Sequence, residues 1–138
     1  MAPSRSLGLP VVLACSTLVS ANVLAQDLRL TGAQEVPPNT SAVVGTGSIK
    51  VDADGNVSGS VSAPTLKQPH AAHIHLGAPG QNGPPIITLN GGDVGTWTVP
   101  DGARLTPEQL QSYKAGNLYV NVHTEAHPGG EIRTQLKP

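Results

Sequence analysis

Residues 118–123 alternate strictly along the chain, and this pattern constrains the fold more than any other. Successive side chains of an extended strand point to opposite faces, so Leu118, Val120 and Val122 share one face. The other three residues share the opposite face. The run therefore predicts a strand with an apolar side for the core and a second side that is more polar.

Short runs of the same kind recur between turn signals. Together they predict strands over residues 27–32, 42–51, 57–61, 72–76, 85–89, 95–99, 118–123 and 131–136. An Asp-Gly-Asn sequence at residues 54–56 predicts a hairpin turn between the second and third of these. Thr106, Pro107 and Gln109 have the spacing of a capped helix start, and Gly116 is a typical stop, so one short helix is expected between them.

These elements predict an all-β domain, which would be an immunoglobulin-like or Greek-key β-sandwich or barrel. About seven or eight strands and one short crossover helix are expected. At 138 residues the chain has the size of one domain. Aromatic residues make up only 2% of it, so the core must be mainly aliphatic. Trp97, the one tryptophan, is expected to plug that core or to cover one end of it.

The first 25 residues have the pattern of a secretory signal peptide. Arg5 is its basic residue, residues 7–21 are largely apolar, and Ala25 ends a cleavage site. The mature domain would then span residues 26–138 and be secreted or periplasmic, with no transmembrane segment. A weaker alternative is a lipoprotein signal in which Cys15 is lipidated.

Cleavage after residue 25 would change the chemistry of the chain in two ways. It would remove Cys15, the one cysteine, so the mature domain would have no disulfide. It would also remove Arg5 and take the formal net charge from −1 to −2. This balance indicates neither a nucleic-acid partner nor a basic membrane-binding face.

All five histidines lie in two short segments, residues 70–75 and 123–127. His73 and His75 are two apart in a predicted strand, so their side chains point to the same face. An imidazole from a neighbouring strand would complete a metal site with one open position, and His123 is the best third ligand.

The two remaining histidines have weaker claims on this site. His127 follows a predicted turn and is expected either as a fourth ligand or at the entrance. His70 precedes the strand, and a loop histidine facing solvent is an equally good interpretation of it. A simpler alternative for the whole group is that the imidazoles only hydrogen-bond to loops.

A ligand set made only of imidazoles suits copper or zinc. The mature chain would have no cysteine and no methionine, which excludes a blue-copper site with a cysteine ligand. Copper is the expected cofactor, because a histidine-only site with an open position could cycle between Cu(II) and Cu(I). Zinc is the alternative, either as a structural ion or as a Lewis acid.

Glu131 and Arg133 share one face of the last predicted strand. They are expected either to be solvated or to support the metal site. In the second case the carboxylate would hold the free N–H of a ligand imidazole, with Glu125 as a weaker candidate. Arg133 would attract a small anion such as superoxide, and His127 would relay a proton, which makes these two the catalytic candidates.

Several motifs in series resemble the CHRD domain family, first named in chordin and common in secreted bacterial proteins. The resemblance covers residues 28–136, and its motifs lie at 30–38, 72–77, 80–83, 105–110, 116–124 and 128–133. It implies an immunoglobulin-like β-sandwich or barrel and little about activity. The His-x-His strand is also loosely similar to that of copper/zinc superoxide dismutases, in which a later histidine follows within a Greek-key barrel.

Three functions remain open at this point. The first is a secreted copper protein that is either redox-active, in the manner of a superoxide dismutase, or active in copper handling. The second is a non-enzymatic extracellular interaction module, as in chordin. The third is a structural zinc-binding domain. A homo-oligomer is compatible with each of them.

Overall fold

The computed structural model describes residues 2–4, 8–16 and 27–138. Residues 8–16 have no regular secondary structure, and large apolar side chains such as that of Leu9 are exposed there. The predicted cleavage site at Ala25 and the basic residue Arg5 lie outside the described residues. In the described ranges, no helix has the length and apolar character that a membrane span requires.

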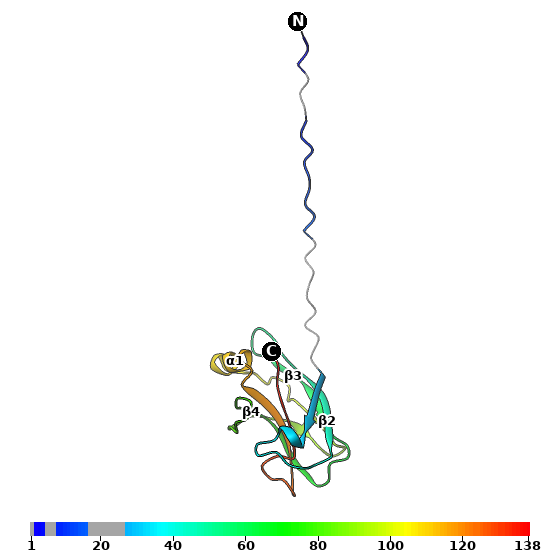
Figure 1. Cartoon of the computed structure of the whole chain (residues 1–138), viewed down its shortest axis with the longest axis vertical. Helices are drawn as coiled ribbons and strands as arrows, with labels where there is room; N and C mark the ends of the chain where they lie inside the picture. The colour runs from blue at the N-terminus through cyan, green and yellow to red at the C-terminus, as the bar shows by residue number, and fades with distance from the viewer. Residues whose placement is uncertain (1, 5–7, 17–26) are drawn as a thin grey trace.

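Residues 27–138 form one antiparallel sheet that curls into a nearly closed barrel (Figure 1). The strands are β1 (Asp27–Thr31), β2 (Val44–Val51), β3 (Val57–Ser62), β4 (Pro69–Leu76), β5 (Pro85–Thr88), β6 (Asn90–Gly91), β7 (Thr96–Thr98), β8 (Leu118–Thr124) and β9 (Ile132–Gln135). Their order is β5-β4-β8-β9-β1-β2-β3-β7-β6. A 3-10 turn, η1 (Gly32–Gln34), follows β1, and the helix α1 (Pro107–Lys114) connects β7 to β8.

The predicted all-β class and the single short α-helix are confirmed for the described residues. The strand count is nine because the predicted strand at 85–89 is followed by a separate two-residue strand, β6, that pairs with β7. The helix begins as expected. The Thr106 side chain accepts a hydrogen bond from the Gln109 backbone N–H, and the Gln109 side chain accepts one from the Thr106 N–H.

The hairpin between β2 and β3 also forms where it was predicted. One carboxylate oxygen of Asp52 accepts hydrogen bonds from the backbone N–H groups of Asp54 and Asn56, both at 2.9 Å. Gly55 has a φ of 88°, a conformation that glycine adopts without steric cost. The turn fixes the register of β2 against β3.

An aliphatic core fills the barrel, as the composition predicted. Leu118, Val120 and Val122 of β8 have no exposed surface, and Ile74 of β4 packs in the same cluster. Trp97 is 2% exposed and belongs to this cluster, so its predicted place in the core is confirmed.

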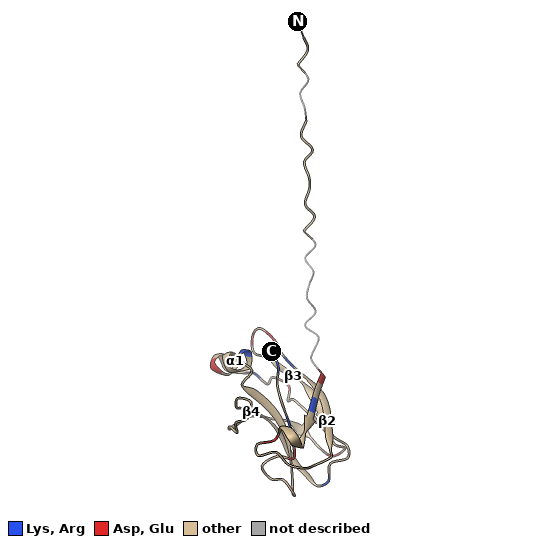
Figure 2. Cartoon of the chain, in the orientation of Figure 1, with Lys and Arg blue, Asp and Glu red and all other residues tan. Residues whose placement is uncertain are grey.

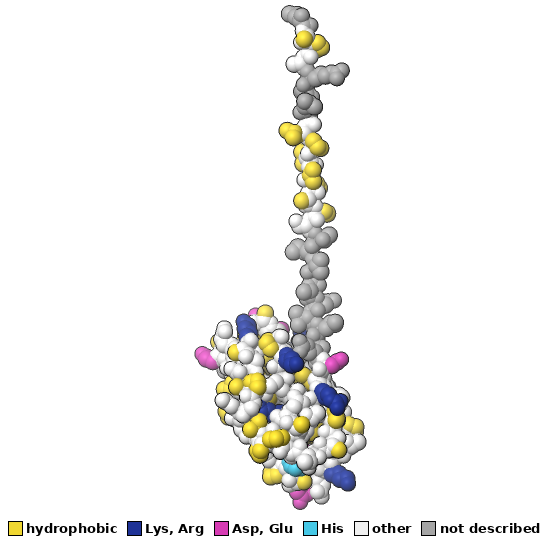
Figure 3. All heavy atoms as spheres, viewed as in Figure 1, with side chains coloured by type: hydrophobic (Ala, Val, Ile, Leu, Met, Phe, Trp, Pro, Cys, Tyr) yellow, Lys and Arg dark blue, Asp and Glu magenta, His cyan; other side chains and the backbone are white. Residues whose placement is uncertain are grey.

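Lysine, arginine, aspartate and glutamate side chains are scattered singly over the visible face of the barrel (Figures 2 and 3).

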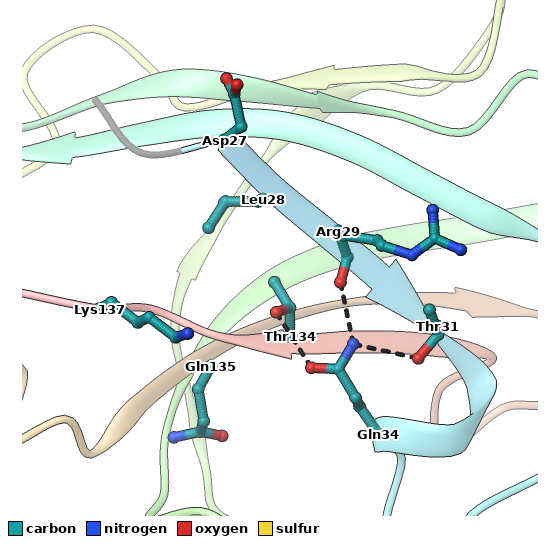
Figure 4. A pocket seen from close by; sticks show the side chains of 8 residues that line it. All are labelled: Asp27, Leu28, Arg29, Thr31, Gln34, Thr134, Gln135 and Lys137. Atoms are coloured by element: carbon teal, nitrogen blue, oxygen red, sulfur yellow. Dashed lines mark hydrogen bonds between the residues drawn. The ribbon is translucent and has the colours of Figure 1, made fainter. Parts of the chain in front are cut away.

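A hollow of about 310 Å³ lies where β1 and β9 separate, because these strands pair only at Thr31 and Arg133 (Figure 4). Gln34 bridges the seam beside it. Its amide N–H donates to the Arg29 carbonyl at 2.9 Å, and its amide oxygen accepts from Thr134 Oγ1 at 3.2 Å. No histidine lines this hollow.

We expect the substitution Trp97→Ala to lower the free energy of unfolding by about 3–5 kcal/mol, because it leaves a large cavity in an aliphatic core. Urea unfolding followed by far-UV circular dichroism measures this without relying on tryptophan fluorescence. The matched control is Val94→Ala, at a side chain that is 82% exposed, with an expected change below about 0.5 kcal/mol. A loss under about 1 kcal/mol for Trp97→Ala would contradict its place in the core.

Candidate metal centre

The pairing of β4 with β8 brings three histidines onto one face of the sheet. The strands are antiparallel, with Ala71 opposite His123, His73 opposite Asn121 and His75 opposite Tyr119. Imidazoles that are 50 residues apart in sequence therefore become neighbours. We call His73, His75 and His123 the histidine cluster.

The imidazoles of the histidine cluster converge on one point. Nδ1 of His73 lies 3.1 Å from Nε2 of His123. The ring centroids of His75 lie 5.5 Å from those of His73 and 5.7 Å from those of His123. One nitrogen from each of the three rings can be chosen so that all lie within 4.8 Å of one another. In the described part of the chain, this is the only group of three or more histidine, cysteine or acidic side chains with such spacing.

Backbone carbonyls orient two of the three rings. His75 Nδ1 donates to the Gly83 carbonyl at 2.8 Å, and His123 Nδ1 donates to the Pro128 carbonyl at 2.9 Å. Each Nε2 is then the nitrogen without a proton, and that of His123 accepts a hydrogen bond from His73 Nδ1. Nε2 of His75 is buried and has no hydrogen-bond partner among the described residues. This is the tautomer that a metal ligand needs.

Burial favours the neutral form of two of the three imidazoles, His73 and His75. Burial lowers the pKa of His73, and the nearby rings of His123 and His75 lower it further. Burial also lowers the pKa of His75, although its bond to the Gly83 carbonyl and the nearby Asn121 side chain oppose that shift. Protons therefore compete less strongly with a metal for these nitrogens.

His75 belongs to a stack of three side chains. Its ring lies on that of Tyr119 with centroids 4.7 Å apart and planes inclined by 3°. On the Tyr119 ring lies the Arg133 guanidinium, whose central carbon is 3.4 Å from the ring centroid. Arg133 also donates to the carbonyl of Gln81 at 2.8 Å and to that of Ala78 at 3.3 Å. The loop at residues 77–84 is thereby held against the same face of the sheet as the cluster.

Of the two alternatives expected for Glu131 and Arg133, the solvated one is wrong. They are 8% and 1% exposed because loops cover this face of the sheet. The Glu131 carboxylate accepts hydrogen bonds from Ser41 Oγ at 2.8 Å and from Thr124 Oγ1 at 2.9 Å. The N–H groups of His75 and His123 donate to carbonyls, so Glu131 accepts a hydrogen bond from neither of these two imidazoles.

The other candidates lie outside the histidine cluster. His127 is half-buried, with its Nε2 4.0 Å from a carboxylate oxygen of Glu131. His70 and Glu125 are exposed. The structure thus brings together three of the five predicted ligands, and His127 lies beside the predicted supporting residue Glu131.

Two buried side chains near the cluster were missed by the sequence analysis. Asn121 lies between Tyr119 and His123 on the same face of β8, a position that the alternation of this strand already indicated. Its Nδ2 donates to a carboxyl oxygen of Glu35 at 3.5 Å. Burial raises the pKa of Glu35 to about 7, although Asn121 and the charge of Arg133 oppose that shift. No local pattern marks Glu35 as buried, because it follows a 3-10 turn in a segment that contains two prolines.

The fold and site together define a class of small antiparallel β-domain with a cluster of three imidazoles on a loop-covered face. The family model for the CHRD domain matches residues 27–136. The chain therefore belongs to the CHRD domain family, and the predicted resemblance is confirmed. No curated protein matches the chain, and no solved structure matches it.

We expect Glu35→Gln to stabilise the protein at pH 8 by at least about 1 kcal/mol and to have little effect near pH 4.5. Between pH 4.5 and about 7 the folded protein binds more protons at Glu35 than the unfolded chain does, so stability falls as pH rises through this window. Melting temperatures of the variant and of the unsubstituted protein at pH 4.5, 6, 7 and 8 measure the difference in stability. The histidines titrate in both proteins, so their effect on stability cancels from this difference. Glu125→Gln, at an exposed carboxylate, is the control, and an equal gain at all pH values for Glu35→Gln would refute the prediction.

We expect Arg133→Lys to cost about 2–3 kcal/mol, since lysine keeps the charge but loses the forked donors and the planar stacking surface. Amide hydrogen exchange should quicken in residues 77–84, whose carbonyls Arg133 binds. Arg29→Lys, at an exposed side chain, is the control. Unchanged protection of that loop would show that Arg133 does not hold it.

Proposed function

We propose that this chain is a secreted or periplasmic protein that binds one copper ion through the histidine cluster. The single observation that supports this most is the convergence of three imidazole nitrogens within 4.8 Å of one another. The carbonyl bonds of His75 and His123 add to it, because they leave the metal-binding nitrogens unprotonated.

Copper is the metal that this donor set favours. Imidazoles suit both copper and zinc, but Cu(II) binds a given nitrogen site more tightly than Zn(II) does. Neither a thiolate nor a carboxylate joins the cluster in the described residues, so all of its ligands would be uncharged. The signal-peptide pattern of residues 1–25 would place the domain outside the reducing cytosol.

Copper handling is the role that we favour for this site. His73 and His123 are only half-buried, so an ion can enter and leave from solvent, and three ligands leave a coordination position open. Superoxide dismutation would use that same open position, but Arg133, the residue expected to guide the anion, lies under the Tyr119 ring and donates to loop carbonyls. Dismutation is therefore the second candidate.

The test is a titration of the mature domain with Cu(II), followed by calorimetry and by electron paramagnetic resonance. We expect one ion per chain with a spectrum typical of nitrogen ligands, and a loss of affinity of at least about 100-fold in the variant His73→Ala/His75→Ala. Matched controls are His70→Ala and His127→Ala, which we expect to change affinity by less than about threefold.

Four other outcomes separate the alternatives. Equal copper binding in the double variant would refute the site. Tighter binding of Zn(II) than of Cu(II), with a higher melting temperature on zinc addition, would favour the structural zinc domain. Binding of neither metal would leave the interaction module. Superoxide consumption by the copper-loaded domain above that of the double variant would assign dismutation instead of handling.

A further inference from the structure

Asn121 occupies the floor of the histidine cluster. It pairs directly with His73 across the two strands, and His123 lies two residues further along its own strand. The three imidazoles belong to longer side chains than the amide does, so they rise around it from adjacent positions of the same face. Asn121 is 2% exposed, and no charged group separates it from the cluster in the strand pairing.

The orientation of the Asn121 amide is fixed from the side away from the cluster. Its Nδ2 donates to the Glu35 carboxyl at 3.5 Å and to the Gly129 carbonyl at 3.4 Å. Gly130 allows this approach, because a Cβ at that position would collide with both Asn121 Nδ2 and the Glu35 carboxyl. With its nitrogen held there, the amide turns its oxygen the other way.

Two buried acceptor atoms in this region lack a hydrogen-bond partner, and in the described residues they are the only buried side-chain polar atoms that do. They are Oδ1 of Asn121 and Nε2 of His75. Neither can donate to the other, because the proton of His75 lies on Nδ1, where Gly83 accepts it. Leaving two such acceptors unsatisfied costs about 1–3 kcal/mol each, and one cation between them would satisfy both.

We propose that the side-chain oxygen of Asn121 is a fourth donor to the metal ion held by the histidine cluster. This inference rests on the proposed function, since it needs the ion to be there. An amide oxygen is a weaker ligand for copper than an imidazole nitrogen. Asn121 would therefore adjust the affinity of the site and leave the three imidazoles as its main ligands.

The test compares two substitutions of Asn121. If the role of Asn121 were purely structural, both would change the affinity for Cu(II) alike. Asn121→Leu removes the oxygen, and Asn121→Asp keeps an oxygen at the same place but loses the N–H groups that bind Glu35 and Gly129. We expect Cu(II) affinity to fall about 10- to 100-fold in the leucine variant and to be at least equal to that of the unsubstituted protein in the aspartate variant. Asn39→Leu is the matched control, because that side chain is also hydrogen-bonded and partly buried but lies outside the cluster, and its affinity should not change.

A second measurement uses the unsubstituted protein, in case a variant does not fold. One equivalent of Zn(II), which is diamagnetic, should shift the side-chain 13Cγ resonance of Asn121 and leave that of Asn56 in the distant hairpin unmoved. An unmoved Asn121 resonance, a leucine variant that binds like the unsubstituted protein, or an aspartate variant as weak as leucine would each overturn the inference. If these occur while His73→Ala/His75→Ala still abolishes binding, the copper proposal stands and only the role of Asn121 fails.

Discussion

The antiparallel pairing of β4 with β8 is the constraint on which the rest of the structure depends. A shift of one residue in this pairing would move every side chain of one strand to the opposite face. Ile74, Val120 and Val122 prevent such a shift, because all three have no exposed surface and would lose their place in the core. The same register sets His73 and His75 beside His123. The geometry of the cluster is therefore a consequence of the hydrophobic core.

Loops also cover the second face of this sheet, and they influence the tautomer and the pKa of His75 in the cluster. The loop at residues 77–84 is bound by Arg133 and supplies the carbonyl that fixes the tautomer of His75. Burial also lowers the pKa of His75, whose ring stacks on that of Tyr119, over which the Arg133 guanidinium lies. The cluster is thus held in one arrangement by groups that lie outside it.

Local patterns predicted those features that depend on neighbouring residues. The alternation at 118–123, the capping box at Thr106 and the same-face spacing of His73 and His75 each act over a few residues, and the structure has all of them. Burial of Arg133 could not be predicted in this way, because its bond to the Ala78 carbonyl joins residues 55 apart. Charged residues on a strand indicate a solvated face unless the loop that covers them is known. The burial of Glu35 likewise depends on contacts with residues distant in sequence, so no local pattern predicts it.

The central claim is that three imidazoles from two strands share one metal ion. X-ray absorption at the copper edge of the mature domain, loaded with one equivalent of Cu(II), tests it most directly, because multiple scattering from imidazole rings counts the histidine ligands. We expect three imidazoles per copper in the unsubstituted protein, falling to one in the variant His73→Ala/His75→Ala. A spectrum with one imidazole or none in the unsubstituted protein would contradict it.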